Sequence, residues 1–187
     1  MICMTKRAHT RPLDARPLTY SAVGATAVSD EIWSATPPEF RRYEQTVPVR
    51  IPWEDARSLM LRWAVKTRSG FRVDADGTGE VSVSAGANVW LRLAVGPVEV
   101  REPIRVVAVA DQPLRCGFSY GTLDGHPVGG EEAFVVHRAT DDGPVLLTIR
   151  SLTRPAPRGL WRYAFPVLLV AQRFFRKRYL SSLNQRP

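Results

Sequence analysis

The sequence predicts an α+β domain in which a curved antiparallel β-sheet wraps over a long C-terminal helix. Three observations carry this prediction. Successive short runs between residues 81 and 151 alternate apolar and polar side chains, which is the period of half-buried strands. Residues 159–183 place apolar side chains three and four positions apart, which is the period of a helix. A shorter helical pattern, residues 52–70, follows the first predicted strand.

The N-terminal part of the chain contributes a flexible segment and an edge strand. Residues 1–17 are polar and contain prolines, so we expect a flexible segment ahead of a single domain at 18–187. "QTVPVRIP", residues 45–52, alternates apolar side chains around Pro48. Proline is tolerated in strands at the edge of a sheet, so this run predicts an edge strand.

Residues 52–70 predict one helix. Pro52 stands at the start, Glu54 and Asp55 in the first turn, and Gly70 just beyond the end. One apolar stripe runs along this helix and must pack on the sheet: Trp53, Ala56, Met60, Trp63 and Ala64.

The run of strands that follows predicts an antiparallel sheet with one buried face and one solvated face. The alternating positions are Val81 and Val83, then 89–93, 98–101, 104–108, 114–121, 132–138 and 144–151. The last helix, residues 159–183, contains Pro166, which either kinks it or marks its first turn. This order of elements is that of helix-grip folds, which commonly leave a cavity between sheet and helix.

Composition indicates a soluble single domain. The chain has 187 residues, 44% of them hydrophobic and 24% charged, and only two cysteines, Cys3 and Cys116. No disulfide framework, secretory signal or membrane-spanning run is expected, so the sequence predicts a cytoplasmic protein. The charge is uneven, because residues 143–187 carry nine basic residues and no acid. This surplus raises the hypothesis that Arg173, Arg176, Lys177 and Arg178 contact an anionic surface.

The stretch "GFSYGTLDGHPVGGEEAF", residues 117–134, holds most of the candidate site. Residues 123–130 predict a loop between two strands, and such loops on a rigid sheet often border binding sites. Glu131 and Glu132 are neighbours on a strand and must point to opposite faces. The one that turns inward is a candidate polar anchor for a ligand, and the alternative is a strand-end carboxylate paired with an arginine.

Aromatic and ionisable residues around that stretch complete a candidate ligand-binding set. His126 by itself is more typical of a solvated loop residue than of a catalytic one. No metal-ligand spacing, phosphate loop or dinucleotide motif occurs, so we expect no metal and no cofactor, and the catalytic residues, if any, stay unassigned. Trp63 is more typical of core than of a cavity wall. The full set is Tyr120, Glu131, Glu132, Phe118, Phe134, Trp63 and His126.

Several of these motifs resemble a known family. "LTYSAVGAT", the central stretch, "SLTRPA" and "RFFRKRYL" are similar to the signatures of a family in bacteria and plants catalogued as domain of unknown function 1990. The resemblance covers residues 18–183. Because the activity of that family is not established, the resemblance implies little about chemistry.

Three functions remain open from the sequence. The favoured one is binding of a small apolar molecule in a cavity between sheet and C-terminal helix. The second is an enzyme of cyclase or dehydratase type that uses a pocket glutamate with Tyr120 as acid and base. The third is an adaptor whose basic C-terminal helix contacts anionic lipid or nucleic acid, although no nucleic-acid-binding motif accompanies the charge. The absence of a catalytic motif favours a protein that is not an enzyme.

Overall fold

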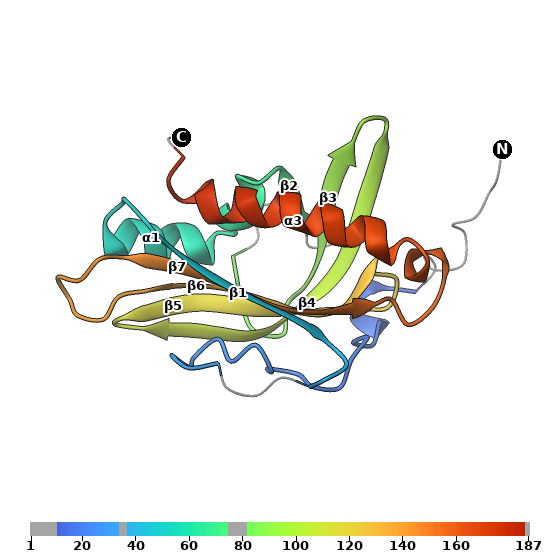
Figure 1. Cartoon of the computed structure of the whole chain (residues 1–187), viewed down its shortest axis with the longest axis horizontal. Helices are drawn as coiled ribbons and strands as arrows, with labels where there is room; N and C mark the ends of the chain where they lie inside the picture. Colours follow the sequence, from blue (N-terminus) through green and yellow to red (C-terminus); the bar gives the residue numbers. More distant parts are fainter. Residues whose placement is uncertain (1–10, 34–36, 75–81, 186–187) are drawn as a thin grey trace.

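A computed structural model describes residues 11–33, 37–74 and 82–185 and shows one curved sheet with α3 across its inner face (Figure 1). The described strands are all antiparallel neighbours in the order β1-β7-β6-β5-β4-β3-β2. Their bounds are β1 Arg41–Pro48, β2 Phe71–Asp74, β3 Asn88–Val95, β4 Val98–Gln112, β5 Arg115–Thr122, β6 Val128–His137 and β7 Leu146–Pro155.

The predicted edge strand is confirmed, and the alternating pattern holds with one interruption. β1 lies at one edge of the sheet, with Pro48 at its last position. A bulge between Val106 and Ala108 shifts the register of β4 against β5. Val106 therefore packs on the inner face, whereas Ala108 and Ala110 pack on the outer face. The expected strand at Val81 and Val83 does not form at Val83, and Val81 lies outside the described residues.

The helix predicted over residues 52–70 is two helices, α1 (Trp53–Leu61) and α2 (Ala64–Thr67). Trp63 separates them in a left-handed conformation, with φ 61°. The apolar stripe explains the break, because the bend lets the Trp63 ring reach Phe118, 4.6 Å away between ring centroids. That ring is 1% exposed.

The C-terminal region forms a short 3-10 helix, η2 (Leu160–Arg162), and then α3 (Phe165–Ser182). Pro166 stands in the first turn of α3, which is one of the two outcomes the sequence allowed. Leu168 is only half-buried and lies on the wall of a cavity rather than in the core. No helix in the described part of the chain is long and apolar enough to cross a bilayer.

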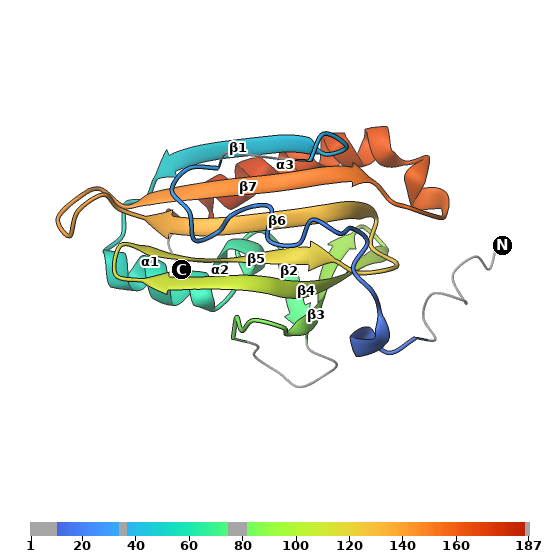
Figure 2. The same cartoon turned by 90° about the horizontal axis from the view of Figure 1, so that it is seen from below.

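The expectation of a solvated outer face is wrong. Figure 2 shows the N-terminal segment crossing that face of the sheet. Tyr20, Trp33 and Val28 are buried there against the strands. Segment 11–17 also belongs to the packed structure: it contains η1 (Leu13–Ala15), and Leu13 is 2% exposed. Residues 1–10 of the predicted flexible segment lie outside the described residues.

Polar groups hold this irregular segment on the sheet, because its described backbone pairs with a strand at one isolated bridge, Leu18 with Leu123, rather than along a ladder. Arg150 on β7 is buried and donates to the carbonyl oxygens of Ala27, Asp30 and Glu31 at 2.7–2.9 Å. The inner face carries the main core instead, in which α1, α2 and the end of α3 cover the sheet. Its inner layer includes Trp63, Phe118, Phe134, Leu147 and Ile149.

Candidate functional site

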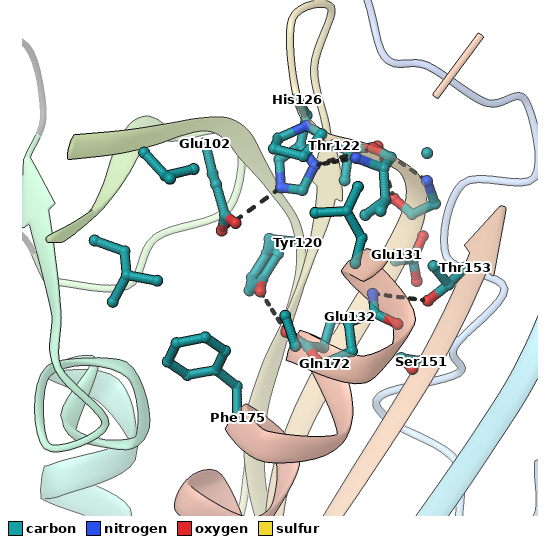
Figure 3. Close-up of a pocket in the computed structure, with 18 of the residues that line it drawn as sticks. Glu102, Tyr120, Thr122, His126, Glu131, Glu132, Ser151, Thr153, Gln172 and Phe175 are labelled. Atoms are coloured by element: carbon teal, nitrogen blue, oxygen red, sulfur yellow. Dashed lines mark hydrogen bonds and ion pairs between the residues drawn. The ribbon is translucent and has the colours of Figure 1, made fainter. Parts of the chain in front are cut away.

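A cavity of about 260 Å³ lies between the inner face of the sheet and α3 (Figure 3). The β3–β4 hairpin and the β5–β6 loop close its sides. The volume corresponds to roughly nine water molecules at about 30 Å³ each. Most of its wall is apolar: Phe71, Leu93, Val95, Val100, Val128, Leu152, Trp161, Leu168, Ala171 and Phe175.

A buried ion pair forms the polar floor of the cavity. Lys66 Nζ on α2 donates to Glu132 Oε2 on β6 at 2.8 Å and to the Tyr179 hydroxyl on α3 at 2.8 Å. The Tyr120 hydroxyl on β5 donates to the same Glu132 oxygen. The Lys66 side chain is 1% exposed, and its ammonium also lies 4.2 Å from the centroid of the Tyr179 ring. Three elements therefore meet at the carboxylate of Glu132, and α3 joins them through the ammonium of Lys66.

The protonation states of this network follow from the ion pair. Burial opposes ionisation of Glu132, but the ammonium of Lys66 outweighs it and lowers the pKa of the carboxyl. Burial, and then the charge of Glu132, raise the pKa of both Tyr120 and Tyr179 well above the usual value. The floor is therefore one carboxylate, one ammonium and two neutral phenols at neutral pH.

A second acid faces the cavity without a comparable partner. Glu102 on β4 keeps 20% of its side chain exposed, and its Oε2 lies 3.8 Å from Nε2 of His126. Burial raises the pKa of Glu102 to about 7; the charge of Lys66 opposes the shift and that of Glu132 adds to it. Figure 3 shows Glu102 and His126 on the same side of the cavity. Glu102 can therefore gain or lose a proton near neutral pH.

His126 is buried rather than solvated, which corrects the sequence-based interpretation. Its ring is 7% exposed, and Nδ1 lies 3.1 Å from the amide nitrogen and 2.9 Å from the carbonyl oxygen of Val128. Burial lowers the pKa of His126 to about 3, so the ring is neutral. The loop that carries it is short, because β5 continues to Thr122 and β6 starts at Val128.

The two neighbouring glutamates point to opposite faces, as the sequence predicts. Glu131 accepts hydrogen bonds from the Tyr20 hydroxyl at 2.6 Å and from the amide nitrogens of Gly24 and Thr26 at 2.8 and 3.0 Å. Gly121 makes room for this arrangement, since a Cβ there would lie 2.4 Å from the Tyr20 hydroxyl oxygen. Glu132 is thus the acid that faces the cavity, while the carboxylate of Glu131 fastens the N-terminal segment.

The other candidate residues divide between cavity and core. Tyr120 and His126 line the cavity with Glu132, and Glu131 also borders it although its carboxylate is bound to the N-terminal segment. Phe118, Phe134 and Trp63 do not line it; they are fully or almost fully buried in the inner core. The interpretation of Trp63 as a core residue agrees with this position.

The cavity residues that were not among the candidates include three ionisable ones: Lys66, Glu102 and Tyr179. Lys66 carried no distinguishing signal, because a lysine in the last turn of a helix is usually explained by the helix dipole. Glu102 did carry one. It has the same strand parity as Val98 and Val100, so an acid stands in line with an apolar strand face.

The four basic residues assigned to an anionic contact do not form one ridge. Arg176 lies 3.9 Å over the Tyr43 ring and donates to the Ser151 hydroxyl at 2.7 Å. Arg178 is half-buried, with its guanidinium close to Gly70. Arg173 and Lys177 are exposed. Helix periodicity explains this division, since positions 176 and 178 fall on the sides of α3 that face protein.

Solved structures show what fold the chain shares. A hypothetical protein from Helicobacter pylori has a TM-score of 0.54 at 9% identity, over 77% of this chain and 84% of that one. Ara h 8.0201 has a TM-score of 0.48 at 10% identity, over 78% and 99% of the two chains. A major latex-like protein from Panax ginseng has 0.46 at 11% identity, over 75% and 98%. The first likeness supports a shared fold and says nothing of function.

Sequence comparison gives the family. A UPF0548 protein of Deinococcus radiodurans is 39% identical over 79 residues, which are 42% of this chain and 39% of that protein. The chain therefore aligns to about two fifths of that relative's length. The model of the family described as "Domain of unknown function (DUF1990)" matches residues 19–182, nearly the whole chain. This chain belongs to that family, as its central motif predicted.

Proposed function

We propose that the protein binds a small, largely apolar molecule in the cavity between the sheet and α3. The observation that carries the proposal is the cavity itself, which combines an apolar wall with a few buried polar groups at one end. Concave, mostly apolar sites with a small number of placed polar groups are the usual form of small-molecule sites.

The polar groups suggest the kind of head group that the ligand carries. Lys66 and Glu132 neutralise each other, so the floor offers no unpaired charge from this pair. Glu102 faces the cavity as an acceptor, and Gln172, which also lines it, has a buried amide oxygen with no hydrogen-bond partner among the described residues. A ligand with a hydroxyl or amine at its polar end would bind to Glu102, whereas a carboxylate would be repelled by it.

The test compares three probes of one chain length, octan-1-ol, octylamine and octanoate, in displacement of an environment-sensitive dye at pH 8. We expect saturable binding with octylamine and octan-1-ol ahead of octanoate. Ala171 lines the cavity, while its neighbour Val170 on α3 is 64% exposed. Ala171→Trp should fill the cavity and weaken binding by at least about tenfold, and Val170→Trp should leave it unchanged. Equal effects of the two variants, or no saturable binding, would count against the proposal.

Acid–base catalysis is a second candidate, and Glu102 rather than Glu132 favours it. The sequence paired a glutamate with Tyr120, and the structure does bring Glu132 to that tyrosine. Both groups are already engaged, however: Glu132 is paired with Lys66, which favours its ionised form, and burial and the charge of Glu132 keep Tyr120 neutral. Glu102 has a pKa of about 7 and faces the cavity, which suits a group that exchanges protons. If the protein is an enzyme, Glu102→Gln should abolish conversion of a molecule that co-purifies with the protein, by mass spectrometry, without preventing octan-1-ol binding.

A further inference from the structure

The exposed apolar side chains of the protein gather on one side. Eight of the ten large apolar side chains that are exposed in the described ranges lie on the β3–β4 hairpin or between η2 and the middle of α3. Figure 1 shows both elements on the same side of the sheet, opposite the N-terminal segment. We call these eight residues the apolar rim: Val95, Val98, Leu160, Trp161, Tyr163, Val167, Val170 and Phe174.

The spacing on α3 makes part of the rim continuous. Val167, Val170 and Phe174 follow one another at three and four positions, so they share one face of the helix, and Tyr163 continues the row before it. Their exposures are 71%, 64% and 56%, and that of Tyr163 is 82%. The adjacent face of the same helix, one residue or about 100° further round, lines the cavity with Leu168, Ala171 and Phe175. Single exposed apolar residues are ordinary, but a row of this length marks an interaction surface.

The charge around the rim selects the partner. Arg158, Arg162, Arg173 and Lys177 are exposed beside the row, and no acid occurs anywhere from residue 143 onward. A second copy of the chain would bring the same positive charge to this face and repel it. A helix face with apolar residues at its centre, basic residues beside it and a Trp and a Tyr at one end is the pattern of segments that lie in an anionic lipid interface.

We propose that the apolar rim docks the protein on the surface of an anionic membrane. The row on α3 and the tip of the β3–β4 hairpin would enter the headgroup region, and Arg173 and Lys177 would contact lipid phosphates. The apolar centre of this face distinguishes it from a nucleic-acid site, where basic and aromatic groups would contact phosphates and bases.

Two residues of the rim also belong to the wall of the cavity. Val95 and Trp161 are both 40% exposed or more and line the cavity. A docked protein would therefore open its cavity toward the lipid, and an apolar ligand could pass between the two without crossing water. This last step rests on the proposed ligand binding, whereas docking itself does not.

The experiment measures co-sedimentation of the full chain with vesicles of phosphatidylcholine alone and of phosphatidylcholine with about 30% phosphatidylglycerol, at increasing salt. We expect binding to the anionic vesicles that weakens with salt. Val167→Ser/Val170→Ser/Phe174→Ser should reduce binding by at least about tenfold. The matched control is Val23→Ser/Ile32→Ser, which changes the two exposed apolar residues outside the rim and should bind as the wild type does. Arg173→Gln/Lys177→Gln should remove most of the preference for anionic lipid.

Several outcomes would overturn the docking proposal. These are no binding to anionic vesicles at low salt, equal binding by the triple variant with an unchanged melting temperature, a dimer in solution that the triple variant dissociates, or binding to duplex DNA in place of vesicles. The two proposals fail separately. Ala171→Trp should lose octan-1-ol and keep vesicle binding, and the triple variant should show the reverse.

Discussion

The two faces of the central sheet bury neighbouring acids in different ways. On the outer face, Glu131 accepts hydrogen bonds from one hydroxyl of Tyr20, from the hydroxyl of Thr26 and from two backbone amides. These donors are all neutral. On the inner face, Glu132 is held by the ammonium of Lys66 and the hydroxyl of Tyr120.

The outer face of the sheet fastens the N-terminal segment and so stabilises the fold, whereas the inner face forms the wall of the candidate site. The outer acid satisfies backbone amides of a segment whose described residues form no regular strand, so it seals that face. The inner acid needs a counter-ion because it stands beside a cavity among aromatic rings. The inner face thereby keeps both an open volume and a fixed set of charges.

The largest expected effect comes from removing the counter-ion on the inner face. Lys66→Met leaves the carboxylate of Glu132, 18% exposed, without its ion-pair partner, although the charge of Arg176 still acts on it, and we expect a loss of about 3–5 kcal/mol in the free energy of unfolding. Urea denaturation measures it. The double variant Lys66→Met/Glu132→Gln removes both charges and should recover much of the loss. A cost below about 1 kcal/mol for the single variant would show that the pair does not organise this face.

On the outer face, the effect of removing one donor should be smaller. Tyr20→Phe deletes a hydrogen bond to Glu131 but leaves three others, so we expect a loss of about 1.5–3 kcal/mol, the range for hydrogen bonds to charged groups. Tyr43→Phe is the matched control, because the Tyr43 hydroxyl bonds to Gln45 at an exposed position. Thermal or chemical denaturation of both variants checks this. If the two variants lost the same amount, Glu131 would not be the fastening point of the N-terminal segment.

The smallest effect concerns Glu102, the inner-face acid without a direct counter-ion, and it depends on pH. The pKa of Glu102 is about 7 in the folded protein, above the ordinary value of 4.5. Between these values the folded protein holds a proton that the unfolded chain has lost, so wild-type stability falls as pH rises and levels off above 7. Glu102→Gln has no titrating group at this position, so it lacks that pH dependence. From pH 5 to pH 8, the free energy of unfolding of the variant minus that of the wild type should rise by about 1–2 kcal/mol, after allowance for the partial exposure of Glu102.

Two other charged groups act on Glu102: the charge of Lys66 lowers its pKa and that of Glu132 raises it, while His126, with a pKa of about 3, stays neutral over that pH range. The control is Glu99→Gln on the same strand. Hydrogen bonding to Arg101, against a small opposing effect of burial, lowers the pKa of Glu99, so this variant should show no pH-dependent gain between pH 5 and pH 8. A pH-independent difference for Glu102→Gln would mean that this acid is not held near its titration point.

Local periodicities of apolar side chains in the sequence predicted much of the architecture. The alternation of apolar and polar side chains predicted the strands. It also required Glu131 and Glu132 to point to opposite faces of the sheet, because successive side chains on a strand do so. Three- and four-residue spacing placed α3, and Pro166 marked its first turn. The central motif identified the family, because a family match depends on the order of residues along the chain and not on their positions in space.

Only the tertiary structure decided what each face meets. The outer face is shielded from solvent because residues 18–33 lie across it. Their sequence has no regular apolar period that would predict this position. Trp63 breaks the predicted helix because its ring packs against Phe118, a contact that overrides the local helical preference.

The candidate site shows the same division. The sequence found Tyr120 and Glu132, which are on paired strands of one motif, but not Lys66, which is 66 residues from its carboxylate partner. The period of apolar residues in the sequence predicts toward which face a side chain points. An ion pair depends in addition on which element packs against that side chain in the folded protein. The sequence therefore determined that the two neighbouring acids point to opposite faces, and packing decided which of them faces the cavity, which acid has a counter-ion, which has neutral donors and which remains free to titrate.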